Sequence, residues 1–222
     1  MSTSCRRERL PIDSSVRSAS HSARAMVRYV LVSCASLAFV NGHVRSLRNR
    51  VRKLTTVPAP DPWRSLPVIA VGGLAAVGFT DDSKSLLVLS SAGGRSLYDT
   101  GTGERIARDR DANLNNWLSE DNTMAAGIGV VADDTVHVAG LWGGGLSTLT
   151  SDGWSCTVVA PDWPIERVVL QPPGADVITE RFASGCVQIA DSAVSDLRVA
   201  GFSPDGRTLV VATAADITLW TR

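Results

Sequence analysis

The 222-residue sequence contains few of the residues that build metal sites and disulfide frameworks. It has three His and four Cys, and the Cys are Cys5, Cys34, Cys156 and Cys186. Neither residue type shows the short spacing of a zinc site, and no two Cys form a close pair. Cys156 and Cys186 fall in apolar segments, where a small buried thiol is expected in preference to a disulfide. We therefore expect no bound metal and no cofactor.

Catalytic motifs are also missing. The sequence has no Gly-x-Ser-x-Gly elbow, and its Gly-rich residues 142–145 lack the Lys-Ser/Thr pair and the following helix of a phosphate loop. The acidic pairs 81–82 and 133–134 fall in expected hairpin turns, where Asp forms local hydrogen bonds. Paired catalytic carboxylates are the alternative interpretation of those residues. No combination of residues forms a catalytic set, so a non-enzymatic function is favoured.

Long hydrophobic runs are absent. Residues 29–40 form an apolar run that is too short to cross a bilayer. The run has the length of a signal-peptide core if translation begins at Met26, and residues 31–34 resemble a lipobox. Against secretion, no clear cleavage site follows and cations crowd the downstream residues. We expect a cytoplasmic protein, with secretion as the alternative.

The formal net charge is zero, but the charge is unevenly distributed. Residues 1–60 carry ten Arg and one Lys against Glu8 and Asp13. Residues 61–222 carry eleven basic and twenty acidic residues. This pattern divides the chain into a basic arm, 1–60, and an acidic body, 61–222. An acidic body argues against nucleic-acid binding by that part of the chain.

A unit of three short strands recurs in the acidic body. In residues 199–220, apolar strands flank a Ser-Pro-Asp-Gly turn, and the third strand ends at Trp220. Residues 77–100 match this unit, with Phe79 at the position of Phe202, Leu86 at that of Leu209 and Tyr98 at that of Trp220. Residues 168–191 match again through Leu170, a Pro-Pro-Gly turn and Ile189, and residues 130–153 form a looser copy. The spacing of about forty residues is typical of a β-propeller.

The repeated unit resembles the WD40 repeat. The resemblance covers residues 66–222, and Tyr98-Asp99 and Trp220-Thr221 stand where that family has its Trp-Asp pair. No Gly-His pair precedes any unit, so the sequence resembles a degenerate relative. The resemblance implies an all-β fold, a small propeller of about four blades, with five as the alternative. It does not imply a function, because propellers have many unrelated activities.

The count of strands predicts how such a propeller would close. Outer strands are expected at residues 104–107 and 155–160, but the last unit stops at Trp220 without one. The spare strand 66–71 would pair with the last unit and join the two ends of the repeat. Four units make a tight ring. A fifth unit within residues 108–126, or an open half-ring that pairs with a second copy, are the alternatives.

The basic arm has two expected parts. Residues 1–25 are rich in Ser and Arg and predict disorder. An apolar stripe farther along predicts a basic amphipathic helix that contacts an anionic membrane, a partner helix or the acidic body itself. The Pro-rich residues 57–64 then form a stiff linker. The stripe consists of Leu37, Val40, Val44, Leu47, Val51 and Leu54.

Three tryptophans are candidates for partner binding. Trp117, Trp142 and Trp163 are expected on loops that open on one face of the propeller, and Trp is favoured where proteins bind. The alternative is that each covers a blade edge as part of the core. We therefore predict a non-enzymatic interaction scaffold whose partner is another protein or a second copy. An enzyme or glycan-binding propeller, or a truncated remnant of a larger repeat protein, are the other interpretations.

Overall fold

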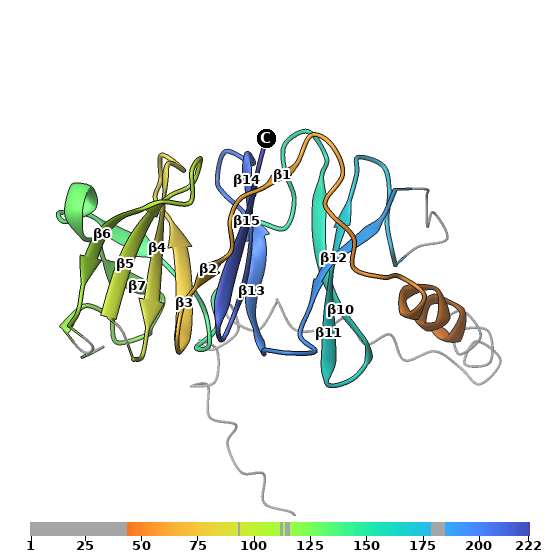
Figure 1. The fold of residues 1–222 in the computed structure, drawn as a ribbon, viewed down its shortest axis with the longest axis horizontal. Coiled ribbons are helices and arrows are strands. Elements are labelled where there is room, and N and C mark those ends of the chain that lie inside the picture. The colour runs from red at the N-terminus through yellow and green to blue at the C-terminus, as the bar shows by residue number, and fades with distance from the viewer. Residues whose placement is uncertain (1–43, 93, 112, 114–115, 179–184) are drawn as a thin grey trace, which may run out of the picture. The chain divides into compact units, whose positions relative to one another are not determined.

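Antiparallel sheets are the main regular structure in the computed structural model, which describes residues 44–92, 94–111, 113, 116–178 and 185–222 (Figure 1). The compact unit spans Gly42–Arg222. The division expected between residues 60 and 61 therefore falls inside this unit. The expected disordered residues 1–25 and the apolar run 29–40 lie outside the described residues. The all-β class is confirmed, with one α-helix, residues 44–52, in the described part.

Sheet C has the strand order expected for the unit at residues 77–100. The strand order is β6 (Arg105–Asp109), β5 (Gly94–Asp99), β4 (Ser85–Ser90) and β3 (Leu74–Phe79), and the short strand β9 (Ala139–Gly140) lies beside β3. Leu86 pairs with both Phe79 and Tyr98. The expected outer strand at 104–107 is also present, as β6.

Sheet B contains the last unit and the expected closing strand. Leu209 pairs with both Phe202 and Trp220, as Leu86 does with its own partners in sheet C. The closing strand is split into two short pieces, β1 and β2, and both pair antiparallel with β15. The N–H of Leu66 also donates to the carbonyl of Leu219 at 2.8 Å. The expected pairing of residues 66–71 with the last unit is therefore found, in interrupted form, whereas the expected closure of a ring is not shown. The strands are β1 (Arg64–Ser65), β2 (Ile69–Ala70), β13 (Leu197–Phe202), β14 (Thr208–Thr213) and β15 (Asp216–Thr221).

Sheet A corrects the expected register of the unit at residues 168–191. Its strands are β10 (Ser155–Asp162), β11 (Ile165–Gln171) and β12 (Val187–Asp191), and β11 is central. Leu170 pairs with both Cys156 and Val187, so it lies in the middle of the sheet and not in a first strand. Residues 155–160 are likewise not an outer strand of the preceding unit. The reason is the turn at residues 150–154, which places β10 directly after it.

The looser copy expected at residues 130–153 is not formed. In its place are the two-stranded sheet D, which consists of β7 (Met124–Ala126) and β8 (Thr135–His137), and the short 3-10 helix η2 (Gly129–Val131). The turn before β7, at residues 119–124, lies in the segment 108–126 that was the alternative place for a further unit. Only a two-stranded ladder follows it, so this unit is incomplete.

One turn recurs four times, and it explains the corrected register. In each copy a Ser or Thr hydroxyl donates to an Asp two residues later and accepts the N–H that begins the next strand. The hydroxyl-to-carboxylate distances are 2.6–2.7 Å, and the returning N–H bonds are 2.9–3.1 Å. The defining feature is therefore Ser/Thr-x-Asp and not Pro-Asp-Gly. The four turns begin at Thr80, Ser119, Thr150 and Ser203.

The sheets pack face to face (Figure 1), and strands β3, β4 and β14 are buried along their whole length. Sheets A and B share one apolar cluster, sheets B and C a second, and sheets C and D a third. Within β14, Leu209 and Val211 face sheet A, whereas Val210 and Ala212 face sheet C. Two buried faces explain why these strands are continuously apolar and do not alternate. Within the described residues no sheet closes into a propeller.

In two units the residue before the Phe is a glycine, because a neighbouring segment lies very close to the strand at that position. Gly78 in β3 and Gly201 in β13 occupy equivalent positions. A Cβ at Gly78 would lie 2.1 Å from the carbonyl oxygen of His137, and one at Gly201 would lie 2.5 Å from the Cβ of Leu146. Neither position has room for a side chain, so these glycines allow a neighbouring segment to contact the strand backbone.

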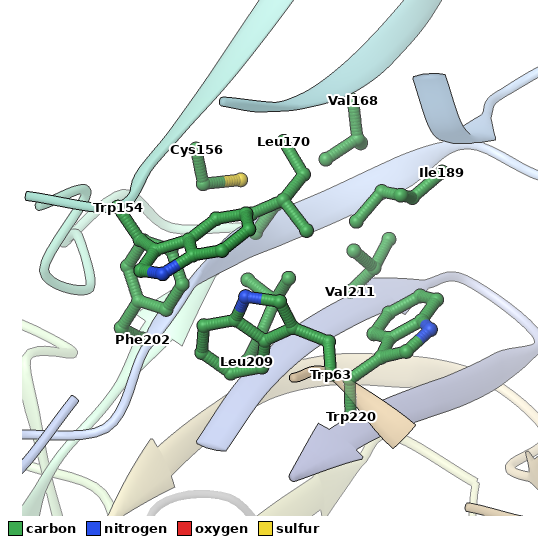
Figure 2. Packing of buried hydrophobic residues seen from close by; sticks show 11 residues of the cluster. Trp63, Trp154, Cys156, Val168, Leu170, Ile189, Phe202, Leu209, Val211 and Trp220 are labelled. Atoms are coloured by element: carbon green, nitrogen blue, oxygen red, sulfur yellow. The ribbon is translucent and has the colours of Figure 1, made fainter. Parts of the chain in front are cut away.

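Trp63 is the centre of the cluster between sheets A and B. Its ring packs edge-on against Trp154, with centroids 5.8 Å apart, and lies 5.5 Å from the ring of Phe202. Figure 2 shows side chains of both sheets converging on it. Trp63 falls in the expected linker 57–64 and immediately precedes β1. This part of the linker is therefore core, and it anchors the closing strand.

Arg222 joins the turns of sheets A and B beside this cluster. Its guanidinium donates to both carboxylate oxygens of Asp152, at 2.5 and 2.7 Å, and to the carbonyl of Gly206 at 3.0 Å. It also lies 4.7 Å from the centroid of the Trp63 ring. The hydrogen bond from Arg222, helped by that from Thr150, holds the pKa of Asp152 well below its ordinary value.

Buried and exposed tryptophans should differ sharply in their contribution to stability. Trp63→Ala and Trp220→Ala each leave a cavity in the cluster between sheets A and B, so each should lower the free energy of unfolding by about 3–5 kcal/mol. Trp163→Ala is the matched control because its ring is 78% exposed. Urea unfolding followed by circular dichroism measures the difference. Equal midpoints for Trp220→Ala and Trp163→Ala would contradict this packing.

The Asp152–Arg222 pair should make stability depend on acidity. Because the folded pKa of Asp152 lies below its unfolded value of 3.8, the pair stabilises the fold above that pH, and its contribution is lost as the pH falls below it. The stability difference between wild type and Asp152→Asn should therefore be constant from pH 7 to 5 and shrink below about pH 4.

Urea unfolding at each pH tests this expectation, with Asp133→Asn as a control in an exposed turn. A wild-type advantage over Asp152→Asn that is the same at pH 3 and pH 7 would contradict it.

Candidate functional site

Helix 44–52 covers the face of sheet A that is turned away from sheet B. Val51 is buried against Val169, Val177 and Cys186, and Leu47 and Leu54 pack at the edge of this cluster. The described part of the expected amphipathic stripe therefore contacts the acidic body, which was one of its three predicted targets. Leu37 and Val40 of the stripe lie outside the described residues.

Arg167 of β11 holds the C-terminal end of this helix. Its guanidinium donates to the carbonyls of Val51 and Leu54 at 3.4 and 3.0 Å, and to the side-chain oxygen of Gln188 at 3.0 Å. The last carbonyls of a helix have no partner inside it and carry partial negative charge. A partly buried cation at this point therefore satisfies them and fixes where the helix ends on the sheet.

Polar contacts from the helix, and from Thr56 after it, add to this docking. Arg52 pairs with Asp162 at 2.5 Å, and Arg48 donates to the carbonyl of Pro161 at 2.6 Å. After the helix, the hydroxyl of Thr56 accepts from the amide of Gln188 at 2.7 Å, and the chain continues beside β12. The helix is thus positioned by specific bonds as well as by apolar packing.

An apolar groove of about 390 Å³ lies between the start of this helix and the end of sheet A that carries the β10–β11 turn. Trp163, at the tip of that turn, is the most exposed of its large side chains, and Val44 and Ile178 are about half exposed. The volume is in the range of pockets that bind compact ligands or single side chains of a partner. The remaining groove residues are Leu47, Arg48, Val51, Val159, Ala160, Pro161 and Val177.

The border of this groove is basic. Residues 44–54 carry five cations and no acid. Arg48 lines the groove itself, and Arg45 and Lys53 of the same segment are exposed. Asp162 is engaged by both Arg52 and Arg167, so its charge is already balanced. An apolar hollow with a cationic border favours a ligand that combines an apolar group with negative charge.

The structure separates the three candidate tryptophans. The expectation that Trp117 lies on an exposed loop is wrong, because its ring is 3% exposed in the core between sheets C and D. Its Nε1 donates to the carbonyl of Asp111 at 3.1 Å, and the guanidinium of Arg95 lies 5.5 Å from its ring centroid. Trp117 is therefore a core residue, as the alternative interpretation held.

Trp142 and Trp163 are both on the surface, but only Trp163 lines the groove. Trp142 is 36% exposed in the loop after β9. Whether either residue binds a partner stays a prediction. Sequence reasoning missed the aliphatic part of the groove, Val159 and Ile178, because a spacing pattern does not show which residues a helix leaves uncovered.

A second hollow, of about 590 Å³, is acidic. It lies between the first recurrent turn and η2, and its lining includes Asp81, Asp82, Asp133 and Asp134. Hydrogen bonds from Thr80 and from the N–H of Lys84 lower the pKa of Asp82, as expected for a turn residue. Across the described part of the chain, no group of three or more His, Cys, Asp or Glu residues could hold a metal ion.

The two described cysteines are inert in this structure. Cys156 and Cys186 are buried free thiols, as expected. Burial raises the pKa of the Cys156 thiol to about 12 and also raises that of Cys186, so neither is activated as a nucleophile. Cys5 and Cys34 lie outside the described residues.

No model of a protein family matches the chain, and no curated protein matches it. Of the helices in the described residues, none has the length and apolar character needed to cross a membrane.

Loss of the Arg167 side chain should release the helix while leaving the sheets folded. Arg167→Met removes hydrogen bonds from a charged group to the helix carbonyls, a loss of about 1.5–3 kcal/mol. Amide hydrogen exchange of residues 44–57 should accelerate about tenfold or more, whereas that of β3 to β5 should not change. Arg207→Met, in an exposed turn, is the control. Unchanged exchange at residues 47–54 would contradict the proposed docking.

Proposed function

We propose that the chain is a non-enzymatic protein-interaction module related to WD40-repeat propellers, and that its partner binds the apolar groove beside helix 44–52. The observation that carries this proposal is the exposed ring of Trp163 at the border of a 390 Å³ apolar groove. An exposed Trp beside aliphatic side chains is characteristic of residues that contribute most to protein binding. The described residues contain no cluster suited to metal chemistry.

The relation to WD40 repeats rests on local geometry. Two sheets repeat the same pairing of Phe79, Leu86 and Tyr98 with that of Phe202, Leu209 and Trp220. A strand from the start of the body also pairs with the last sheet, as expected from the count of strands. The stack differs from a ring because helix 44–52 covers the outer face of sheet A.

The charge around the groove narrows the kind of partner. Because the border is basic, we propose that the partner inserts an apolar side chain flanked by Asp or Glu. The acidic body of a second copy is the other candidate, and a test of self-association distinguishes the two. Two unpaired buried thiols fit a reducing compartment, so we place this interaction in the cytoplasm.

Truncation of the groove should weaken partner binding without unfolding the protein. The double variant Trp163→Ala/Ile178→Ser removes two exposed apolar side chains, and loss of an interface Trp commonly costs about 2 kcal/mol or more, about thirtyfold in affinity. Val194→Ser is the matched control because Val194 is fully exposed and does not line the groove.

The partner is first identified by photo-crosslinking from position 178 in cells that produce the chain, and its affinity for each variant is then measured with purified proteins. Sedimentation of the chain alone tests the second copy as partner. Equal affinity of the groove variant and wild type for the crosslinked protein would overturn the proposal.

A further inference from the structure

A small polar hollow lies on the outer part of sheet C, away from the groove described above. It has a volume of about 140 Å³ and lies between β5, β6 and the chain around β2. This is below the roughly 300 Å³ at which pockets for larger organic ligands begin. The hollow therefore suits a small ligand. The polar side chains that line it are Ser90, Ser96, Tyr98, Arg105 and Arg108.

An irregularity in strand pairing brings the two arginines to this hollow. Arg105 pairs with Tyr98 and Arg108 pairs with Ser96, with a register shift between the two pairs. Residues three apart in a regular strand point to opposite faces, whereas an extra residue in the strand restores them to the same face. Both guanidinium groups consequently line one hollow.

The charge of these arginines is not balanced by the protein. Within the described residues, neither the guanidinium of Arg105 nor that of Arg108 has a hydrogen bond or an ion pair. Glu104, directly before the strand, is exposed and forms no ion pair with them. Asp109, the acid within the strand, is held by Arg95 at 2.6 Å, and that bond lowers the pKa of Asp109. Asp99 accepts the N–H groups of Gly101 and Thr102 in its own turn. Two cations thus remain available to an anion.

Hydroxyl groups beside the arginines complete a set of donors. The ring of Tyr98 is fixed in the core between sheets B and C, which holds its position at the wall of the hollow. Ser96 lies on the same strand, two residues earlier, and faces the same side. Ser90 is already engaged, because its hydroxyl donates to the carbonyl of Gly72 at 2.6 Å. The opposite wall, at Gly72, is open, since a Cβ there would meet no atom within 4 Å.

We propose that this hollow binds a phosphate group, held by the guanidinium groups of Arg105 and Arg108 and by the hydroxyls of Tyr98 and Ser96. Arginine matches phosphate in geometry through paired N–H groups, and hydroxyls donate to the remaining oxygens. The group is either free phosphate or the phosphate of a phosphorylated residue. This site is independent of the groove at Trp163.

The experiment titrates inorganic phosphate and, separately, O-phospho-L-serine into the full chain, with sodium chloride added to keep ionic strength constant. Binding is followed by amide chemical shifts of β5 and β6 in NMR spectra. The variant is Arg105→Gln/Arg108→Gln, and Arg110→Gln/Arg207→Gln is a control with the same change in net charge. Tyr98→Phe tests the phenol hydroxyl while keeping the buried ring.

Wild type and the control should bind with the same affinity, Arg105→Gln/Arg108→Gln should bind at least tenfold more weakly, and Tyr98→Phe should bind more weakly than wild type. Tighter binding of inorganic phosphate assigns the site to the free ion, and tighter binding of phosphoserine assigns it to a phosphorylated residue. Equal shifts in wild type and Arg105→Gln/Arg108→Gln would overturn the proposal, as would the absence of shifts in both.

Discussion

The insertion of Trp63 between sheets A and B is the interaction on which the rest of this structure depends. The same residue fills the cluster between two sheets, starts the strand that pairs with β15, and contacts Arg222, which links the turns of both sheets. A single side chain thus joins the packing of the sheets to the completion of sheet B. Without it, β15 would have an unpaired edge and the two sheets a cavity between them.

The predictable part of the fold is the part in which local chemistry repeats. The units at 77–100 and 199–220 share a turn, a buried Phe and a terminal aromatic residue, and the sequence predicts both their equivalence and the segment that pairs with β15. Pro-Asp-Gly as the mark of the turn predicts the middle of the chain wrongly. The four turns share Ser/Thr-x-Asp, and Thr150-Ser151-Asp152 and Ser119-Glu120-Asp121 show this pattern without proline.

The candidate site was less predictable for a physical reason. The sequence predicts surface loops for Trp142, Trp163 and Trp117. Trp142 and Trp163 are exposed in the structure, whereas Trp117 is buried. Burial of Trp117 depends on contacts with Leu87 and Leu97 of sheet C, which are distant in sequence. Similarly, Arg105 and Arg108 share a hollow only because of a register shift in β6. Neither fact follows from local spacing.

The groove itself follows from how the outer face of sheet A is covered. A neighbouring sheet would match its strands in length, since β10 has eight residues and spans about 27 Å. The described helix at 44–52 spans only about 14 Å, and Arg167 fixes its last turn on the sheet. Among the described residues, this helical segment contacts the β10–β11 turn through Arg48 and Arg52, and its apolar side chains leave a groove beside Trp163. The groove therefore depends on how the side chains of a helix meet the end of a sheet.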